Sequence, residues 1–294
     1  MSRKKIFFIV NPISGNQKHQ ITNDLVERYF DQNQYEINIC NTKFKKHAVE
    51  LTKKALESNP YCVVACGGDG TVNEVASCLV NTKVILGIIP VGSGNGLASN
   101  LLIPLNVMKS LGVLSKFKTT TIDVGAVNKQ FFFSNMGFGI DANIIKNYES
   151  IQQRKFIGYL KAVKMSFNNF EYSNYTYTIQ KQTRNAHPYL FFISNSNEMG
   201  YGLSLTPKAL LNDGFFNLVL VEKINLFKQL MFGLFVLLKK ASDFKQMESA
   251  LIQQIEIKSH KGYFDLQIDG EYHLLQSDVL HIEVIHRGIE VIIP

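Results

Sequence analysis

Three glycines and one carboxylate, Gly67-Gly68-Asp69-Gly70, follow an apolar run at residues 61–66 that has the length of a buried strand. Thr71 can cap the helix predicted next, in which apolar residues recur at helical spacing (Val72, Val75, Ala76 and Leu79). Because glycine can adopt positive φ, we expect a tight turn between the strand and the helix. Such a turn directs backbone N–H groups and the positive end of a helix to one point, which suits a phosphate group.

Two further turns place small and polar residues directly after predicted strands. Residues 5–10 form an apolar strand that ends at NPISG, residues 11–15, and residues 84–89 form a strand that ends at PVGSGNG, residues 90–96. Strands and helices alternate through this half of the chain, which predicts a parallel sheet with helices on both faces. The three turns should then meet at the carboxyl edge of the sheet, where open α/β folds bind ligands.

The pattern changes near residue 120, where short strands separated by turn residues replace the strand–helix alternation. We therefore expect an α/β domain at residues 1–120 and an antiparallel β domain at residues 121–294. Within the second domain, residues 251–257 are predicted to form one strand, and residues 279–284 and 289–293 two more. Residues 152–170 and 226–240 are predicted helices. The sequence leaves open whether the last strand returns to the first domain.

The composition is that of a globular chain with a preference for anions. Of the 294 residues, 46% are hydrophobic and 19% are charged, and the net charge is +7 with a pI near 9.1. This charge favours nucleotides, nucleic acid or an acidic membrane surface as partners. The absence of tryptophan and of any recognition-helix or aromatic RNA-binding motif argues against nucleic acid.

Cysteine usage and the apolar runs indicate a cytoplasmic protein. Cys62 and Cys66 lie in one predicted strand, roughly 13 Å apart by strand rise, which is too far for a disulfide. The run at residues 6–10 is too short for a secretion signal, and the run at residues 230–238 is too short to span a bilayer. We expect a protein that is soluble or sits on a membrane without crossing it. The seven histidines are scattered and form no close pair with a carboxylate in the sequence, so structural or surface roles are expected.

Seven motifs occur in a fixed order: NPISG (11–15), GGDGTVNEV (67–75), PVGSGNGLA (90–98), IDVG (122–125), GFGIDA (137–142), P-x-A-x-x-x-D-G (207–214) and IDGE (268–271). As a set they resemble the diacylglycerol kinase catalytic family, which includes sphingosine and ceramide kinases and bacterial lipid kinases. The resemblance implies ATP- and Mg²⁺-dependent phosphorylation of a lipid hydroxyl. It also implies a three-layer α/β nucleotide-binding domain like that of NAD kinases, a C-terminal β-sandwich, and an active site in the cleft between them.

The resemblance assigns the nucleotide site to the three glycine-rich turns and one further position. Asn73 and Glu74 also match an Asn-Glu pair of NAD kinases, although a polar first turn of a helix explains them equally well. The full set of residues expected to bind the nucleotide is Asn11, Pro12, Ser14, Gly15, Thr42, Gly67, Gly68, Asp69, Gly70, Thr71, Asn73, Glu74, Gly92, Ser93 and Asn95.

Phosphoryl transfer to a hydroxyl needs neutralised phosphate charge and a carboxylate that accepts the hydroxyl proton. Bacterial relatives suggest Glu271 as this base and sphingosine kinases suggest Asp69; we favour Glu271 and keep Asp69 as the alternative. The family places Asp123 near the metal and the lipid head group. Without the resemblance, the alternative interpretation of Asp123 is an exposed aspartate on a strand. The family also places a structural Mg²⁺ at Asp213 and the carbonyls of Leu210 and Phe215, where the alternative is an ordinary turn.

The sequence does not determine which lipid accepts the phosphoryl group. The third turn, Ser93 to Ala98, is more like that of long-chain-base kinases than the G-T-x-N-D pattern of bacterial diacylglycerol enzymes, so diacylglycerol, a sphingoid base or a related lipid is expected. Two rival functions are NAD phosphorylation and a non-catalytic nucleotide- or lipid-binding regulator.

Peripheral contact with an anionic membrane is expected, and a homodimer is compatible with the sequence. Phe156, Tyr159, Leu160, Val163 and Phe167 form a helical stripe beside Lys161 and Lys164, which suits either core packing or acidic lipid.

Overall fold

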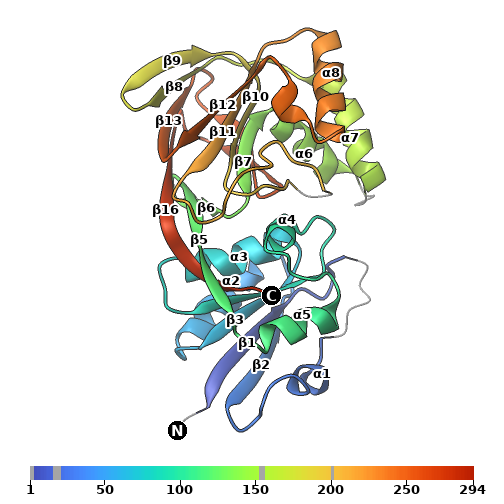
Figure 1. Ribbon diagram of the computed structural model, residues 1–294, viewed down its shortest axis with the longest axis vertical. Coiled ribbons are helices and arrows are strands. Elements are labelled where there is room, and N and C mark those ends of the chain that lie inside the picture. Colours follow the sequence, from blue (N-terminus) through green and yellow to red (C-terminus); the bar gives the residue numbers. More distant parts are fainter. Residues whose placement is uncertain (1–2, 16–20, 152–155, 200–201) are drawn as a thin grey trace. The chain divides into compact units, whose positions relative to one another are not determined.

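The structure is a computed structural model that describes residues 3–15, 21–151, 156–199 and 202–294 (Figure 1). The chain forms two compact units. The α/β unit comprises Met1–Ile122 and Arg287–Pro294, and the β unit comprises Asp123–His286. Strands β5 (Thr119–Val127) and β16 (Val279–Ile292) carry the chain out of the first unit and back into it. The division thus falls at residue 122, and the last eight residues are part of the α/β unit.

The α/β unit is built on parallel strands in the order β2-β1-β3-β4. These are β1 (Lys4–Val10), β2 (Tyr35–Asn41), β3 (Cys62–Gly67) and β4 (Ile85–Pro90), and β16 joins β4 in parallel at Val291 and Leu86. Every residue of β3 and β4 is buried, because helices cover both faces of the sheet. Their sequences are therefore continuous apolar runs rather than alternating ones.

Helices on both faces of this sheet complete three layers (Figure 1). One side carries α1 (Asn23–Glu27) and α5 (Val107–Leu114), whose Val26 and Leu111 share a core with Ile6 and Phe8 of β1. The helices α2 (His47–Leu56) and α3 (Asp69–Leu79) pack on β1 and β3 and on each other. The predicted three-layer α/β fold is confirmed; α5 and the five-residue α4 (Gly96–Asn100) are two helices that were not predicted from the sequence.

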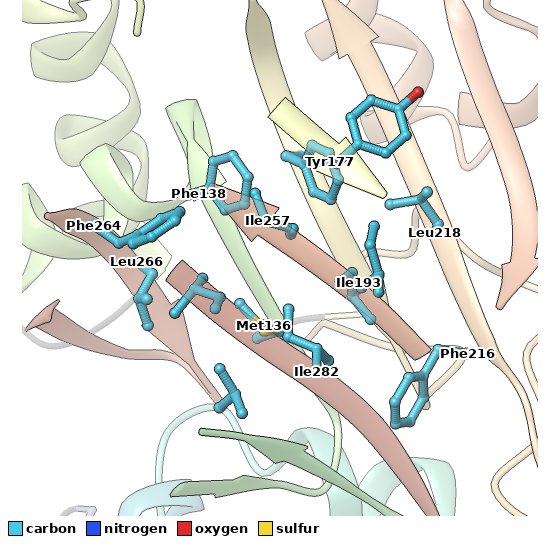
Figure 2. Close-up of a cluster of buried hydrophobic side chains, with 14 of the residues drawn as sticks. Met136, Phe138, Tyr177, Ile193, Phe216, Leu218, Ile257, Phe264, Leu266 and Ile282 are labelled. Atoms are coloured by element: carbon cyan, nitrogen blue, oxygen red, sulfur yellow. The ribbon is translucent and has the colours of Figure 1, made fainter. Parts of the chain in front are cut away.

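The β unit is a sandwich of two antiparallel sheets. One sheet has the order β12-β11-β10-β7-β14-β15, with bounds Met247–Ile252, Phe216–Glu222, Pro188–Ser194, Asn135–Gly139, Phe264–Ile268 and Glu271–Leu275. In the other, β16 is followed by β13 (Gln254–Ser259), β8 (Tyr175–Ile179) and β9 (Gln182–Ala186), and β5 pairs with β16 and β6 (Gln130–Phe132). Figure 2 shows the core between the sheets, with Met136, Phe138 and Phe216 from one and Tyr177, Ile257 and Ile282 from the other.

Two strand predictions in this unit are wrong. The single strand expected at residues 251–257 is two strands, because β12 pairs with β11 in one sheet and β13 pairs with β16 and β8 in the other. The chain changes sheets at Gln253, which lies between them. Conversely, the two strands expected at residues 279–284 and 289–293 are one 14-residue strand, β16. The local preference for extended backbone is similar before and after Gln253, and likewise before and after residues 285–288. Only the pairing partners therefore decide where each strand ends.

Helices of the β unit are α6 (Ile140–Ser150), α7 (Phe156–Asn169) and α8 (Leu226–Leu237), followed by the short 3₁₀ helix η1 (Ala241–Asp243). On α7, Tyr159, Val163 and Phe167 are half-buried and Leu160 is exposed; the side chain of Phe156 lies outside the described residues. The predicted stripe is therefore partly core and partly surface. Across the described residues, no helix combines the length and apolar character that crossing a bilayer requires.

The four cysteines carry no disulfide in the structure. Cys62 and Cys66 are buried in β3, and Cys40 and Cys78 are half-buried. Burial raises the pKa of the Cys62 and Cys66 thiols, so both stay protonated at neutral pH. These residues act as small apolar side chains of the sheet.

Candidate functional site

The three glycine-rich loops converge at the carboxyl edge of the α/β sheet, as predicted. A Cβ atom on Gly92 would lie 2.2 Å from Gly68 Cα, and one on Gly15 would lie 2.0 Å from the Val91 carbonyl oxygen. Any side chain at Gly92 or Gly15 would therefore separate the loops. The expectation that Gly67, Gly68 and Gly70 supply positive φ is wrong, because none of them has it and Gly68 has φ −92°. Glycine is required at the Gly68–Gly92 crossing by close backbone approach instead.

Asn11 and Thr71 join the first loop to the second. The Asn11 Nδ2 group donates to Thr71 Oγ1 at 3.1 Å, and Asn11 Oδ1 accepts from the backbone N–H of Ile13. Ser14 lies near the same crossing, with Oγ 3.7 Å from the position of a Cβ on Gly68. Pro12 is exposed on this loop. The backbone N–H of Thr42 donates to the Val10 carbonyl, which places Thr42 next to the start of the loop.

Asp69 joins the second loop to the third. Its Oδ2 accepts from the Asn95 backbone N–H and its Oδ1 from that of Gly96, both at 2.7 Å. The carboxylate thereby caps α4, whose own N-cap residue, Asn95, is left-handed and makes no side-chain cap. Since both oxygens hold backbone amides, the geometry favours a positioning role for Asp69 over that of a proton acceptor.

The third loop is closed by Asn95. Its Oδ1 accepts from the Gly92 N–H at 3.0 Å and its Nδ2 donates to the Gly92 carbonyl at 2.7 Å. This leaves Ser93 exposed at the tip of the loop, while Asn95 itself is buried. Beside it, Gly68 is the N-cap residue of α3 and makes no side-chain cap, and Gly70 lies in the first turn of this helix. Backbone N–H groups at an uncapped helix start are suited to an anion.

Glu74 and Asn73 have partners within the protein. Glu74 Oε1 accepts from the Lys46 N–H at 3.0 Å and Oε2 from the Ala48 N–H at 3.2 Å, so its carboxylate caps α2. Lys46, at the N-cap of α2, has φ 69° and makes no side-chain cap of its own. Asn73 accepts from the Ser77 hydroxyl along α3. These contacts explain both residues structurally, which was the alternative left open by the sequence.

In the β unit, Glu271 begins β15 directly after a two-residue hairpin turn. Asp269 and Gly270 both have positive φ, 46° and 79°, which is the type I′ geometry that Asp-Gly favours. The Asp269 carboxylate accepts from three backbone N–H groups, those of Phe133, Ser134 and Asn135, at 2.8–3.1 Å. Sequence reasoning missed Asp269, although the Asp-Gly pair between two strands is a hairpin signal. This carboxylate fixes the turn that carries Glu271.

Asp123 is fully buried rather than exposed, which corrects the simple reading of it as an exposed strand residue. Its Oδ1 lies 2.8 Å from Nδ1 of His286, and its Oδ2 accepts from the Gly214 N–H at 2.6 Å. The sequence contains no close histidine–carboxylate motif, yet the fold brings His286 to Asp123. The two residues are 163 positions apart, so nothing local in the sequence indicates the pair.

The expected metal residues lie together in one exposed turn. Asp213 Oδ1 accepts from the Phe215 N–H at 3.0 Å, and Leu210 and Phe215 are both exposed. Gly214, within this turn, is the residue that Asp123 holds. Among the described residues no group of three or more His, Cys, Asp or Glu side chains is placed to hold a metal ion. A cation here would take one carboxylate with main-chain carbonyls and water, a donor set that fits Mg²⁺.

A further carboxyl group, Asp141, lies at the start of α6 in the GFGIDA segment. Burial raises its pKa to about 6, and the side chain of Gln267 lowers it in part. Its Oδ2 has no hydrogen-bond partner among the described residues. Gln267 Nε2 also donates to Asn135 Oδ1, and Gln267 Oε1 accepts from the Gly270 N–H. Asp141 therefore adjoins the network that supports the Glu271 hairpin.

Comparison with known families accounts for almost the whole chain. Residues 5–127 match the diacylglycerol kinase catalytic domain, and residues 134–288 match the YegS C-terminal NAD kinase beta sandwich-like domain. The chain therefore belongs to the family of diacylglycerol kinase catalytic domains that carry this C-terminal sandwich. Membership identifies it as a kinase, and the kinase family implies a nucleotide as phosphoryl donor.

Individual relatives agree with this assignment. The chain is 28% identical over 304 residues to a diacylglycerol kinase of Staphylococcus aureus (strain JH9), covering 99% of this chain and 93% of that one. A Bacillus anthracis str. Sterne structure, provisionally described as a diacylglycerol kinase, has a TM-score of 0.81 at 21% identity, covering 99% and 95% of the chains. Yeast NADH kinase complexed with NADH has a TM-score of 0.51 at 10% identity, covering 100% and 84%. The last two show the fold alone.

Proposed function

We propose that the protein is an ATP- and Mg²⁺-dependent lipid kinase that transfers the γ-phosphoryl group to the hydroxyl of diacylglycerol, a sphingoid base or a related lipid. The observation that carries this proposal is the convergence of three glycine-rich loops at one sheet edge, with Asp69 locking two of them together. The Staphylococcus aureus relative, named a diacylglycerol kinase, supports a lipid acceptor.

In this proposal the nucleotide phosphates bind the backbone N–H groups of the loops and of the uncapped start of α3. A bound Mg²⁺ supplies neutralisation of phosphate charge. Asp69 keeps the loops in register, and Thr71 and Asn11 hold the first loop against the second. Preformed donors of this kind need little reorganisation when the phosphoryl group moves, which is the main requirement of phosphoryl transfer.

Glu271 is the proposed general base. Its position at the end of a hairpin turn that three amides pin through Asp269 gives it the fixed placement that proton transfer needs. Asp69, the alternative base, already uses both carboxylate oxygens for the α4 amides. Asp123 and the Asp213 turn, joined through Gly214, are the proposed support for a cation.

The test is a labelled-ATP assay on a panel of lipids that includes diacylglycerol and sphingoid bases. Wild type should phosphorylate at least one lipid, and Glu271→Gln should lower kcat by about 10²–10⁴-fold, the usual contribution of a general base. Glu248→Gln, an exposed glutamate on β12, is the matched control and should act as wild type. A near-normal rate for Glu271→Gln with a large loss for Asp69→Asn would move the base to Asp69; no labelled lipid at all would refute the proposal.

A second candidate acceptor is NAD(H), because the fold resembles yeast NADH kinase and the GGDGT and Asn73-Glu74 residues recur in NAD kinases. The Glu74 carboxylate opposes this candidate, since both oxygens cap α2. Formation of NADP(H) from NAD(H) and ATP, with no lipid product, would favour it over lipid phosphorylation.

A further inference from the structure

The outer face of α8 is apolar and exposed. Six large side chains on or just after the helix are 49–71% exposed: Leu226, Phe227, Leu230, Leu234, Leu237 and Leu238. At 100° per residue they fall within roughly 120° of the helix circumference, so they form one continuous stripe. Exposed leucines occur singly elsewhere on most proteins, but a contiguous apolar stripe marks a surface that is covered in function.

The helix is held firmly by its opposite face. Phe232 is buried and contacts Tyr189 and Phe244, and Phe235 also contacts Phe244. At the N-terminus the Asn225 side chain accepts from the Lys228 N–H, which caps the helix. The apolar stripe is therefore a surface of the folded β unit rather than a consequence of a poorly packed helix.

The charged side chains within residues 223–240 are all basic. Residues 223–240 contain no aspartate or glutamate and four exposed lysines: Lys223, Lys228, Lys239 and Lys240. Helix α7 also lacks acidic residues and exposes Ile157, Leu160 and Met165 together with Lys161 and Lys164. Phe170, just beyond α7, contacts Tyr189, which also contacts Phe232 of α8. An apolar stripe bordered by lysines is the pattern of a helix that lies in the interface of an acidic membrane.

We propose that this face of α8 docks on an anionic lipid bilayer, with the leucine and phenylalanine side chains in the acyl boundary and the lysines at the head groups. The inference rests on the proposed function, because it names the surface from which a lipid substrate would be collected. The positive charge of the lysines indicates which partner covers this face of α8. A second copy of the chain on a two-fold axis would bring the same four lysines together, whereas anionic head groups neutralise them.

The experiment is co-sedimentation of the full chain with phosphatidylcholine vesicles, with and without phosphatidylglycerol. Wild type should bind the anionic vesicles, and binding should weaken as salt is raised. The variant Phe227→Ser/Leu230→Ser/Leu234→Ser should lower the vesicle partition coefficient about tenfold or more, because three large apolar side chains no longer enter the interface. The matched control is Leu251→Ser, an exposed leucine on β12 of the same unit, which should bind as wild type.

A second variant, Lys239→Gln/Lys240→Gln, tests the charge separately and keeps the apolar face intact. It should lower binding to anionic vesicles several-fold and reduce the salt dependence, since each lysine near an acidic surface favours binding. If the triple variant does not fold, as judged by circular dichroism, this variant and the salt series decide the question.

Three outcomes would overturn the proposal: no binding of wild type to anionic vesicles, equal binding by the triple variant, or an equal loss in Leu251→Ser. Light scattering adds a fourth, a wild-type dimer that the triple variant dissociates, which would make the face an interface between copies. Phosphorylation of a short-chain lipid in detergent micelles separates this from the proposed function. The triple variant should keep its rate there, whereas absence of any lipid product with wild type would refute the kinase proposal alone.

Discussion

The loop region of the α/β unit and the hairpin region of the β unit both use a carboxylate to hold backbone amides, but they are stabilised differently. In the loops, Asp69 accepts from two amides while the backbones themselves touch at Gly68 and Gly92. In the hairpin, Asp269 accepts from three amides of a segment about 135 positions earlier, and Asn135 and Gln267 extend the network. The loops depend on a carboxylate and also on the absence of side chains where the backbones meet, whereas the hairpin is held by side chains.

The largest effect is expected at the glycine crossing. Gly92→Ala places a Cβ 2.2 Å from Gly68 Cα, so two loops must separate, and activity should fall by at least about 100-fold, since misplacement of about 1 Å has that effect. Gly112→Ala, whose Cβ would meet nothing within 4 Å, is the control and should keep full activity and gain about 0.5–1 kcal/mol of helix stability. ATP-binding and rate measurements on both variants check this. Full activity in Gly92→Ala would show that the crossing is not needed.

The next effect compares the contributions of the Asp269 and Asp69 carboxylates to stability. Asp269→Ala leaves three backbone donors without their acceptor and should lower the free energy of unfolding by about 2–4 kcal/mol. Asp69→Ala removes two such bonds and should cost about 1–3 kcal/mol. Urea unfolding of each variant gives both values, with Asp278→Ala, an exposed aspartate, as the control. A larger loss for Asp69→Ala would reverse the comparison.

A third effect, which depends on pH, concerns Asp141, a buried carboxyl with one oxygen that lacks a partner in the described residues. Its folded pKa of about 6 lies above the ordinary value of 3.8 for aspartate, so the folded state binds more protons than the unfolded state between these pH values. Stability should therefore fall as pH rises from about 4 to about 6. Asp141→Asn should be more stable than wild type by about 1–3 kcal/mol at pH 8, and the difference should vanish below pH 4.

Thermal unfolding across this pH range gives the measurement for Asp141. Asp141 contrasts with Asp269, because three backbone amides hold the Asp269 carboxylate whereas one Asp141 oxygen has no partner among the described residues. A constant difference between Asp141→Asn and wild type at every pH would mean that the carboxyl group does not titrate in this range.

The elements that could be predicted from the sequence are those that local residues determine. The loops at residues 11–15, 67–71 and 90–96 each follow a fully apolar strand, and parallel strands necessarily bring their carboxyl ends together. The helix α8 was predicted at residues 226–240 because its apolar spacing is local, and the structure has it at Leu226–Leu237.

Contacts between distant segments could not be predicted in this way. The pairing of Asp123 with His286 depends on where β5 and β16 meet, and the break between β12 and β13 depends on which sheet each joins. The role of Glu74 was also hidden, because the amides that it caps lie 26–28 positions earlier. In each case the residue type permits several roles, and only the tertiary partner selects one.

The return of β16 to the α/β sheet has a consequence for biosynthesis. Val291 pairs with Leu86, the Gly288 carbonyl accepts from Asn81, and Ile293 donates to the Lys118 carbonyl. During synthesis the ribosome therefore completes the whole β unit before it adds the end of β16, the strand that completes the sheet of the α/β unit. The α/β unit must wait, with this edge of β4 uncovered, until residues 287–294 have been synthesised.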